Sequence, residues 1–507
     1  MKTLILSEWL LTQLSHSKFP TRMANHRRLY AIIRRAITEQ LLPSGSRLPS
    51  TRSLATDLNV SRNTILAAFD QLLDEGYVAA KTGSGTYVCY KQTEALFKQA
   101  ENDANSSKAI QSITKMSQSA LSRRGQTACD APENHEIQPF TPGDDDYSRF
   151  PIALWRRLLN RHWRALNPTL LDSSHDGGYL PLRQAIADYL RMSRAVNLSV
   201  EQVLITSGTQ QSIDLCARLL TDEGDCVWLE NPCYWAARRV LEVNGLQLHP
   251  VNVDAEGMAP STADFRMKPR LIYTTPSHQY PKGMVMSYGR RRLLLDYADS
   301  QQAWIIEDDY DSEFRFEGRP ISSLQGMDEH GRVLYLGTFS KVIYPGIRLG
   351  YMVIPPQLVD AFKNGLYELQ RPGQVMIQAA LADFMEEGHF ASHIRRLKQT
   401  YAERRRLLQA ALAPIVNVGG RLSPVDSGLH LVVEFDANID DVKVAELAAE
   451  QGLRVYPLSN YCMGEQREKG LIIGYAYAAT DKITEYGNLL ADIIQTALNQ
   501  QINNCKR

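Results

Sequence analysis

The sequence predicts two domains: a small α+β domain near the N-terminus and a larger α/β domain with a mostly parallel sheet. The length of 507 residues exceeds what one compact core normally holds. Within 23–90, three short helical patterns precede two alternating, strand-like stretches. From residue 136 to 507, apolar strand-like runs alternate with helical stretches, which favours an α/β fold. Residues 91–135 are polar and lack aromatic residues after Phe97, as is typical of a linker.

Composition narrows the possible partners. The chain has 56 basic and 56 acidic residues, so bulk charge cannot hold it to nucleic acid or to a membrane. Residues 1–90 nevertheless carry eleven Lys/Arg against six Asp/Glu. Residues 1–22 are expected to be a separate helical segment rather than a signal peptide, because Glu8 interrupts the apolar run. With no apolar stretch near ~20 residues and seven scattered cysteines, we expect a cytoplasmic protein that binds no membrane and no metal.

The helices of the N-terminal domain are predicted from apolar spacing and from capping residues. Apolar residues at helical spacing predict a first helix over 27–42. A second helix is expected to begin at Ser50 or the next residue, and Asn59 is the expected turn. Ser61 can cap a third helix, which Gly76 would end.

A β-hairpin is predicted after the third helix, from alternating stretches within 77–89 that flank a Gly-Ser-Gly turn. Helix, turn, helix and hairpin in this order direct the start of the third helix toward a major groove. The side chains expected to contact bases there are Arg62, Asn63 and Thr64, and Ser61, the cap of this helix, is counted with them in the DNA-binding surface. The side chains of Arg47, Ser50 and Arg52, and the hairpin backbone at Gly83 and Gly85, are expected to contact phosphates or the minor groove. The alternative is a protein-binding module whose arginines are merely solvated.

The motifs of this domain favour the DNA-binding interpretation. Arg-Leu-Pro-Ser-Thr-Arg-Ser-Leu-Ala from residue 47, Val-Ser-Arg-Asn-Thr from residue 60 and Gly-Ser-Gly-Thr-Tyr-Val from residue 83 stand in order. Together they resemble the winged helix-turn-helix of the GntR family of bacterial transcription factors. The resemblance covers residues 23–90 and implies double-stranded operator DNA as a partner.

A second set of residues has the chemistry that pyridoxal 5'-phosphate requires. Asp308 and Tyr310 follow a strand-like run at a spacing of two, so they can face one ligand. About thirty residues later come Thr338, Ser340 and Lys341, with Arg348 following. A lysine can form a Schiff base, a carboxylate can pair with a pyridine nitrogen, and hydroxyls with an arginine can bind phosphate. Upstream, Ser207, Gly208 and Thr209 open a helix after a strand, which either binds phosphate or is an ordinary capped helix.

The order of these segments resembles fold-type I pyridoxal-phosphate enzymes, the aspartate aminotransferase superfamily. The resemblance implies that Lys341 forms the Schiff base, that Asp308 keeps the pyridine nitrogen protonated and that Tyr310 hydrogen-bonds the ring hydroxyl. It implies a phosphate site made by Ser207, Gly208, Thr209, Thr338, Ser340 and Arg348. Tyr234 would lie against the ring, with core packing as the alternative. His278 and Gln279 fall in a segment that aminotransferases place beside the cofactor.

The two halves together resemble the MocR subfamily of GntR-type regulators. This resemblance implies a cytoplasmic homodimer that binds DNA and senses pyridoxal phosphate or its adduct with an amine or amino acid. The subfamily branch that senses γ-aminobutyrate has arginines at the positions of Ala236 and Asn460, so that effector is not expected here.

The alternative is a working aminotransferase with an accessory DNA-binding head. Transamination of α-amino acids usually needs an arginine for the substrate carboxylate, often on the strand that corresponds to 471–476. This strand contains no arginine, so at most weak activity is expected. Arg421 and Arg454 could substitute for it, or each could be a solvated surface charge.

Overall fold

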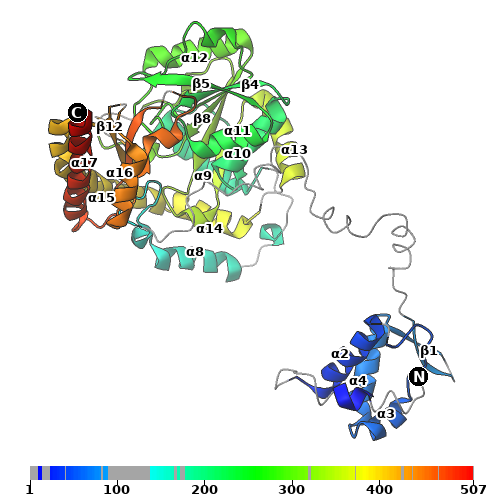
Figure 1. Cartoon of the computed structure of the whole chain (residues 1–507). Coiled ribbons are helices and arrows are strands. Elements are labelled where there is room, and N and C mark those ends of the chain that lie inside the picture. Colours follow the sequence, from blue (N-terminus) through cyan, green and yellow to red (C-terminus); the bar gives the residue numbers. More distant parts are fainter. Residues whose placement is uncertain are drawn as a thin grey trace, which may run out of the picture. The chain divides into compact units, whose positions relative to one another are not determined.

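The computed structural model describes residues 9–13, 23–39, 41–81, 84–89, 138–164, 168–171, 177–317, 321–370, 373–423, 427–436, 438–465 and 467–505. The chain divides into two compact units, residues 1–116 and 117–507. Figure 1 shows both units, and each is described by itself below.

The first unit contains the predicted three helices and hairpin. Its elements are α2 (Asn25–Thr38), α3 (Thr51–Asp57), α4 (Arg62–Asp74), β1 (Val78–Lys81) and β2 (Gly85–Val88). As predicted, the side chains of Ser50 and Ser61 cap α3 and α4 by accepting hydrogen bonds from the backbone of Ser53 and Thr64.

The ends of the helices follow from local chemistry. Helix α2 ends four residues before the predicted end, because Leu42 turns back, donates its N–H to the Ala36 carbonyl and is buried. Asn59 forms the turn between α3 and α4 with a φ of 50°, and Gly76 follows α4 with a φ of 74°. The first unit therefore has a core of its own, built mainly from the apolar faces of α2, α3 and α4.

The second unit is built around an eight-stranded, mostly parallel sheet with strand order β3-β10-β9-β8-β7-β4-β5-β6. The strands β9, β8, β7, β4 and β5 run parallel, whereas β10 is antiparallel to both β3 and β9 and β6 is antiparallel to β5. Their bounds are β3 (Val203–Thr206), β4 (Cys226–Asn231), β5 (Gln247–Asp254), β6 (Gly257–Met258), β7 (Leu271–Thr274), β8 (Trp304–Asp309), β9 (Val333–Thr338) and β10 (Gly350–Val353).

Helices cover both faces of this sheet, because alternate residues of each strand point to opposite sides. Leu271 and Ile306 pack in one cluster with α10 (Thr209–Leu220), α11 (Trp235–Val243) and α13 (Val359–Leu369). The intervening Ile272 and Ile305 pack instead with α12 (Tyr288–Gln301). Figure 1 shows α12 on one side of the strands and α10 with α11 on the other. Further along the sheet, α9 (Leu180–Arg194) and α14 (Val375–Glu386) join the largest core cluster, and α8 (Ile152–Arg164) packs on α14.

A smaller antiparallel sheet completes the second unit, with strand order β11-β12-β14-β13. Its strands are β11 (Arg421–Leu422), β12 (His430–Phe435), β13 (Tyr456–Pro457) and β14 (Lys469–Gly474), accompanied by α15 (His389–Leu412), α16 (Asp441–Glu450) and α17 (Ile483–Cys505). Over the residues that the structure describes, no helix is both long and apolar enough to span a bilayer.

Candidate cofactor pocket and DNA-binding surface

A cavity of about 580 Å³ lies where the carboxyl ends of several sheet strands meet. The parallel strands β4, β7, β8 and β9 end at one edge, and β3 ends there too because two antiparallel steps restore its direction. Ligands of open α/β sheets bind at this edge. Nine of the twelve predicted cofactor residues line the cavity: Gly208, Thr209, Tyr234, Asp308, Tyr310, Thr338, Ser340, Lys341 and Arg348.

Lys341 follows the end of β9 and is held against the segment before α8. Its Nζ donates to the Gly143 carbonyl and lies 3.9 Å from Oδ2 of Asp145. Asp145 is buried, and neither of its carboxyl oxygens has a hydrogen-bond partner among the described residues. Burial raises the pKa of Asp145 to about 7, although the charge of Lys341 acts to lower it. The amine of Lys341 therefore lies near a carboxyl group that is shielded from water.

Asp308 closes the floor of the cavity at the end of β8. The Tyr273 hydroxyl donates to Oδ2 of Asp308 at 2.6 Å, while Oδ1 is buried without a hydrogen-bond partner among the described residues. Burial raises the pKa of Asp308 to about 7, and the hydrogen bond from Tyr273 lowers it. A buried carboxyl oxygen without a partner suits a cationic N–H donor such as a protonated pyridine ring.

Tyr310 and Tyr234 bring two hydroxyl-bearing rings to the cavity wall. His278 Nδ1 lies 2.8 Å from the Tyr310 hydroxyl and 2.9 Å from Oδ2 of Asp311, so a buried polar group supports Tyr310 from behind. Burial is the main cause of the raised pKa of both Tyr310 and Tyr234, which keeps the two phenols protonated. Each can therefore donate a hydrogen bond to a ligand oxygen.

The start of α10 and Arg348 form a ready anion site. Gly208 precedes α10 with a φ of 125°, and no side chain caps this helix end. Its first backbone N–H groups are therefore available to an anion. The two terminal nitrogens of Arg348 lie 4.0 Å from where a Gly208 side chain would begin, so the guanidinium is next to this helix start. Thr338 and Ser340 line the same cavity, and this donor set fits a phosphate group.

Three predicted cofactor residues lie off the cavity wall. The hydroxyl of Ser207 donates to Oε1 of Gln211 and faces a neighbouring small cavity. His278 lies behind Tyr310, and Gln279 donates to the Pro232 carbonyl at 2.8 Å. Their roles as cofactor contacts remain predictions.

The sequence patterns did not indicate several residues that line the cavity, because a single aromatic residue in an apolar run does not differ from an ordinary core residue. Tyr273 lies inside β7, where an apolar strand pattern predicts only core packing. Trp235, Tyr280, Tyr456 and Tyr461 form an aromatic wall together with Tyr234. The hydroxyl of Tyr273 is the signal that could have indicated it, because a buried tyrosine hydroxyl needs a hydrogen-bond partner.

Arg421 and Arg454, the two arginines that could contact a substrate carboxylate, lie in different surroundings. Arg421 has a side chain that is 58% exposed, and it pairs with Asp436 at 3.0 Å. Arg454 lines the cavity. Ala236 is fully buried on α11, and Asn460 is exposed.

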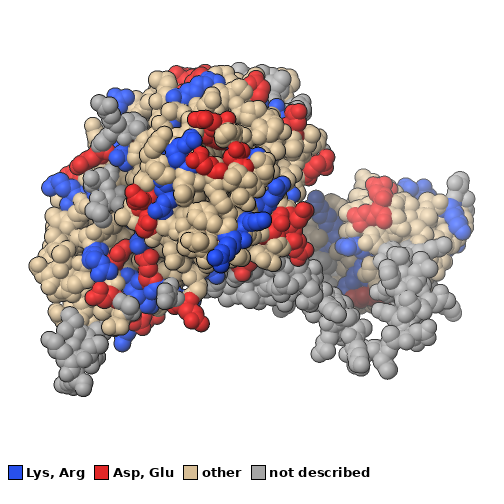
Figure 2. Space-filling model, turned by 90° about the horizontal axis from the view of Figure 1, so that it is seen from above, with Lys and Arg blue, Asp and Glu red and all other residues tan. Residues whose placement is uncertain are grey.

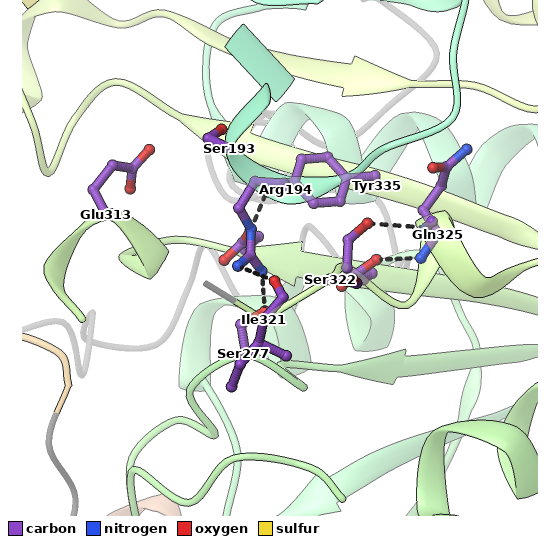
Figure 3. A network of polar contacts seen from close by, with 12 residues as sticks. Ser193, Arg194, Ser277, Glu313, Ile321, Ser322, Gln325 and Tyr335 are labelled. Carbon is purple, nitrogen blue, oxygen red and sulfur yellow. Dashed lines mark hydrogen bonds and ion pairs between the residues drawn. The ribbon is translucent and has the colours of Figure 1, made fainter. Parts of the chain in front are cut away.

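A buried polar network that includes Arg194, Ser277 and Tyr335 (Figure 3) surrounds Asp309 of β8. Asp309 directly follows Asp308 on the strand, so the two side chains point to opposite faces of the sheet. Nε of Arg194 donates to Oδ2 of Asp309 at 2.8 Å, and the Tyr335 hydroxyl donates to the same oxygen at 2.5 Å. The Arg194 guanidinium also donates to the Ile321 carbonyl and to the hydroxyl of Ser277. Ser277 directly precedes His278, so the network links β8 to the loop that supports Tyr310.

The predicted DNA contacts gather around the starts of α3 and α4 and the hairpin. Arg47, Arg52, Arg62 and Asn63 are exposed. The hydroxyls of Ser50 and Ser61 serve as helix caps, and Thr64 contacts the hydroxyl of Ser61 at 2.8 Å. The Arg47 guanidinium packs on Gly85, where an added side chain would begin 3.0 Å from Nε. Gly83, the N-terminal segment 1–22 apart from residues 9–13, and the predicted linker 91–135 lie outside the described residues.

On the face seen in Figure 2, basic and acidic side chains are interspersed.

Comparisons with known proteins agree with both units. Residues 25–88 match the family of bacterial regulatory proteins named gntR, and residues 144–469 match aminotransferase class I and II. The probable rhizopine catabolism regulatory protein MocR of Rhizobium meliloti is 39% identical over 89% of this chain and 90% of its own. The pyridoxine biosynthesis transcriptional regulator PdxR of Corynebacterium glutamicum is 33% identical over 87% of this chain and 90% of its own.

Solved structures resemble the second unit. A kynurenine aminotransferase of Pyrococcus horikoshii has a TM-score of 0.66 and 25% identity, and the match covers 79% of this chain and 99% of that one. The α-aminoadipate aminotransferase LysN of Thermus thermophilus has the same score and identity over 72% and 93%. These matches define a transcriptional regulator with a GntR-type DNA-binding unit and a fold-type I aminotransferase-like unit. The chain belongs to the MocR subfamily of GntR-family regulators.

Proposed function

We propose that the second unit binds pyridoxal 5'-phosphate at Lys341, and that the chain, as a homodimer, reports the bound cofactor or its adduct with an amine to operator DNA. The observation that carries this proposal is that Lys341 and Asp308 line the same cavity. Oδ1 of Asp308 is buried there and has no hydrogen-bond partner among the described residues. When bound, the cofactor supplies an aldehyde carbon that a primary amine can attack.

The side chains of this chain would then have distinct tasks. Asp308 would hold a positive charge at the pyridine nitrogen, helped by the hydrogen bond from Tyr273. Tyr310, supported by His278, would donate to the ring hydroxyl. Arg348 and the open start of α10 would bind the phosphate.

Sensing requires that the ligand favour one arrangement of the dimer over another. A ligand shifts DNA affinity only by its difference in binding free energy between the two arrangements. The effector can be pyridoxal phosphate itself or an amine that reacts with it. The residues proposed to hold the cofactor lie at or directly after the ends of β3, β8 and β9, so a bound cofactor would contact several strand ends at once.

The cofactor assignment is tested by reduction and peptide mapping. Wild-type protein loaded with pyridoxal phosphate is expected to be yellow, and borohydride should fix the pyridoxyl group to Lys341. Lys341→Ala should lose both signals, whereas Lys443→Ala, which changes an exposed lysine on α16, should keep them. A pyridoxyl group found mainly on another lysine would overturn the assignment.

The second candidate is a catalytically active aminotransferase. It is favoured by the presence of Lys341, Asp308, Tyr310 and an arginine on one cavity. Turnover distinguishes the candidates: protein mixed with amino acids and a keto-acid acceptor should show a spectral change with little product if it is a sensor. Sustained transamination at roughly 1 s⁻¹ or more would favour the enzyme.

A further inference from the structure

One basic side chain of the cavity has no task in the proposed binding of the cofactor. Lys341, Asp308 and Arg348 are all used by that proposal, but Arg454 is not, although it lines the same cavity. Nε of Arg454 is buried and has no hydrogen-bond partner among the described residues. A buried guanidinium nitrogen without an acceptor costs free energy, which a bound anion would recover.

The backbone fixes Arg454 beside the cavity. Leu453 and Val455 are buried in the core, whereas Arg454 and Tyr456 alternate with them and both reach the cavity wall. Tyr456 begins the edge strand β13 and pairs directly with Ile472 of β14. The arginine therefore stands at the edge of the smaller sheet, next to an apolar strand.

Arg454 is also tied to the segment that holds Lys341. Its backbone N–H donates to the Pro139 carbonyl at 2.9 Å. Four residues further on, the Gly143 carbonyl accepts a hydrogen bond from Lys341. The positions of the guanidinium and of the reactive amine are thus linked through one short stretch of chain.

The surroundings of Arg454 favour a ligand with one charge and an apolar body. Tyr456, Tyr461, Tyr280 and Trp235 line the adjacent wall. Burial raises the pKa of Tyr456, whereas the charge of Arg454 and a hydrogen bond from its guanidinium lower it, so the Arg454 side chain is held toward this wall. Asp144 is the acidic lining residue that the cofactor proposal leaves unused, and burial raises its pKa.

We propose that Arg454 binds the carboxylate of the amine that enters this cavity, so that the effector is an amino acid rather than a simple amine. This inference rests on the proposed binding of pyridoxal phosphate at Lys341. A planar guanidinium can donate two parallel hydrogen bonds to a carboxylate and so fixes both its position and its orientation. The amino group of the same molecule would then face Lys341.

The test compares amino acids with the amines that lack their carboxylate, such as leucine with isoamylamine and phenylalanine with phenylethylamine. Each is titrated into protein loaded with pyridoxal phosphate, and the cofactor absorbance gives an apparent Kd. For at least one pair, wild type should bind the amino acid roughly 10- to 100-fold more tightly. Arg454→Gln should bring this ratio close to one without changing the affinity for the amine, and Arg454→Lys should keep part of it.

Arg421→Gln is the matched control, because Arg421 is exposed and pairs with Asp436 outside the cavity. This variant should keep the wild-type ratio. A ratio near one for every pair in wild type, or a ratio that survives in Arg454→Gln, overturns the assignment of Arg454 and leaves the cofactor proposal standing. A protein that takes up no pyridoxal phosphate overturns both.

Discussion

The start of α4 and the cavity at the sheet edge present their functional side chains in opposite ways. At α4, Arg62 and Asn63 are adjacent in sequence and exposed. In the cavity, Asp308 and Lys341 come from different strands, and Asp308 is buried beside Tyr273. Substitutions at the start of α4 should therefore change the affinity for DNA alone. Substitutions behind the cavity should also lower the stability of the second unit.

The largest effect is expected in the buried network behind β8. Arg194→Met removes the ion-pair partner of the buried Asp309, leaving it the hydrogen bond from Tyr335, and should lower the free energy of unfolding of the second unit by about 3–5 kcal/mol. Urea unfolding followed by tryptophan fluorescence measures this unit, which holds five of the six tryptophans. As a control, Arg218→Met breaks an exposed pair with Asp214 and should change stability by less than about 1 kcal/mol. Equal effects of the two variants would contradict the contrast.

A smaller effect, on DNA rather than on the fold, is expected at α4. Arg62→Ala should weaken operator binding by about 1–3 kcal/mol and relax specificity at one base pair, if Arg62 contacts a guanine edge. Unfolding of the first unit should be unchanged, because Arg62 is exposed. The measurement is anisotropy of labelled DNA from upstream of the chain's own gene, at several salt concentrations. A contact to phosphate alone would weaken all sequences alike. Unchanged affinity in both Arg62→Ala and Arg52→Ala would refute the assignment.

The contributions of two carboxyl groups, Asp308 in the second unit and Glu75 in the first, should change with pH in opposite directions. Burial raises the pKa of Asp308 to about 7, so in protein without cofactor this residue destabilises the fold increasingly as pH rises from about 4 to about 7. Asp308→Asn should therefore gain stability relative to wild type over that window.

The exposed Glu75 provides the comparison. Hydrogen bonds from Tyr30 and Gln71 lower the pKa of Glu75. The stability that Glu75 contributes is present above its unfolded pKa and is lost as pH falls through its folded pKa. Glu75→Gln should thus lose stability relative to wild type as pH rises. Unfolding curves of both variants from about pH 3 to about pH 8 cover both windows and check the signs, and the same sign in both would contradict this comparison.

The same contrast explains what the sequence could predict. Caps and turns of the first unit depend on local chemistry, so Ser50, Ser61 and Asn59 were placed correctly. In the second unit the strand ends were predictable, and with them the gathering of Asp308, Lys341 and Arg348.

What could not be predicted is the direction of side chains in loops and the contacts between distant segments. Ser207 turns toward Gln211, and Gln279 toward Pro232, because nearby acceptors compete for their donors. Arg421 and Arg454 look alike in sequence. Only the pairing of β13 with β14 places Arg454 at the cavity.

The central claim, that the cavity and the operator are coupled, is tested most directly by reciprocal titration. The affinity for operator DNA is measured with and without pyridoxal phosphate, and the affinity for pyridoxal phosphate with and without DNA, at one salt concentration. The account predicts that both affinities change by the same factor, as linkage requires, and that Lys341→Ala removes the change while still binding DNA. Operator affinity that is identical with and without the cofactor and amino acids would contradict it.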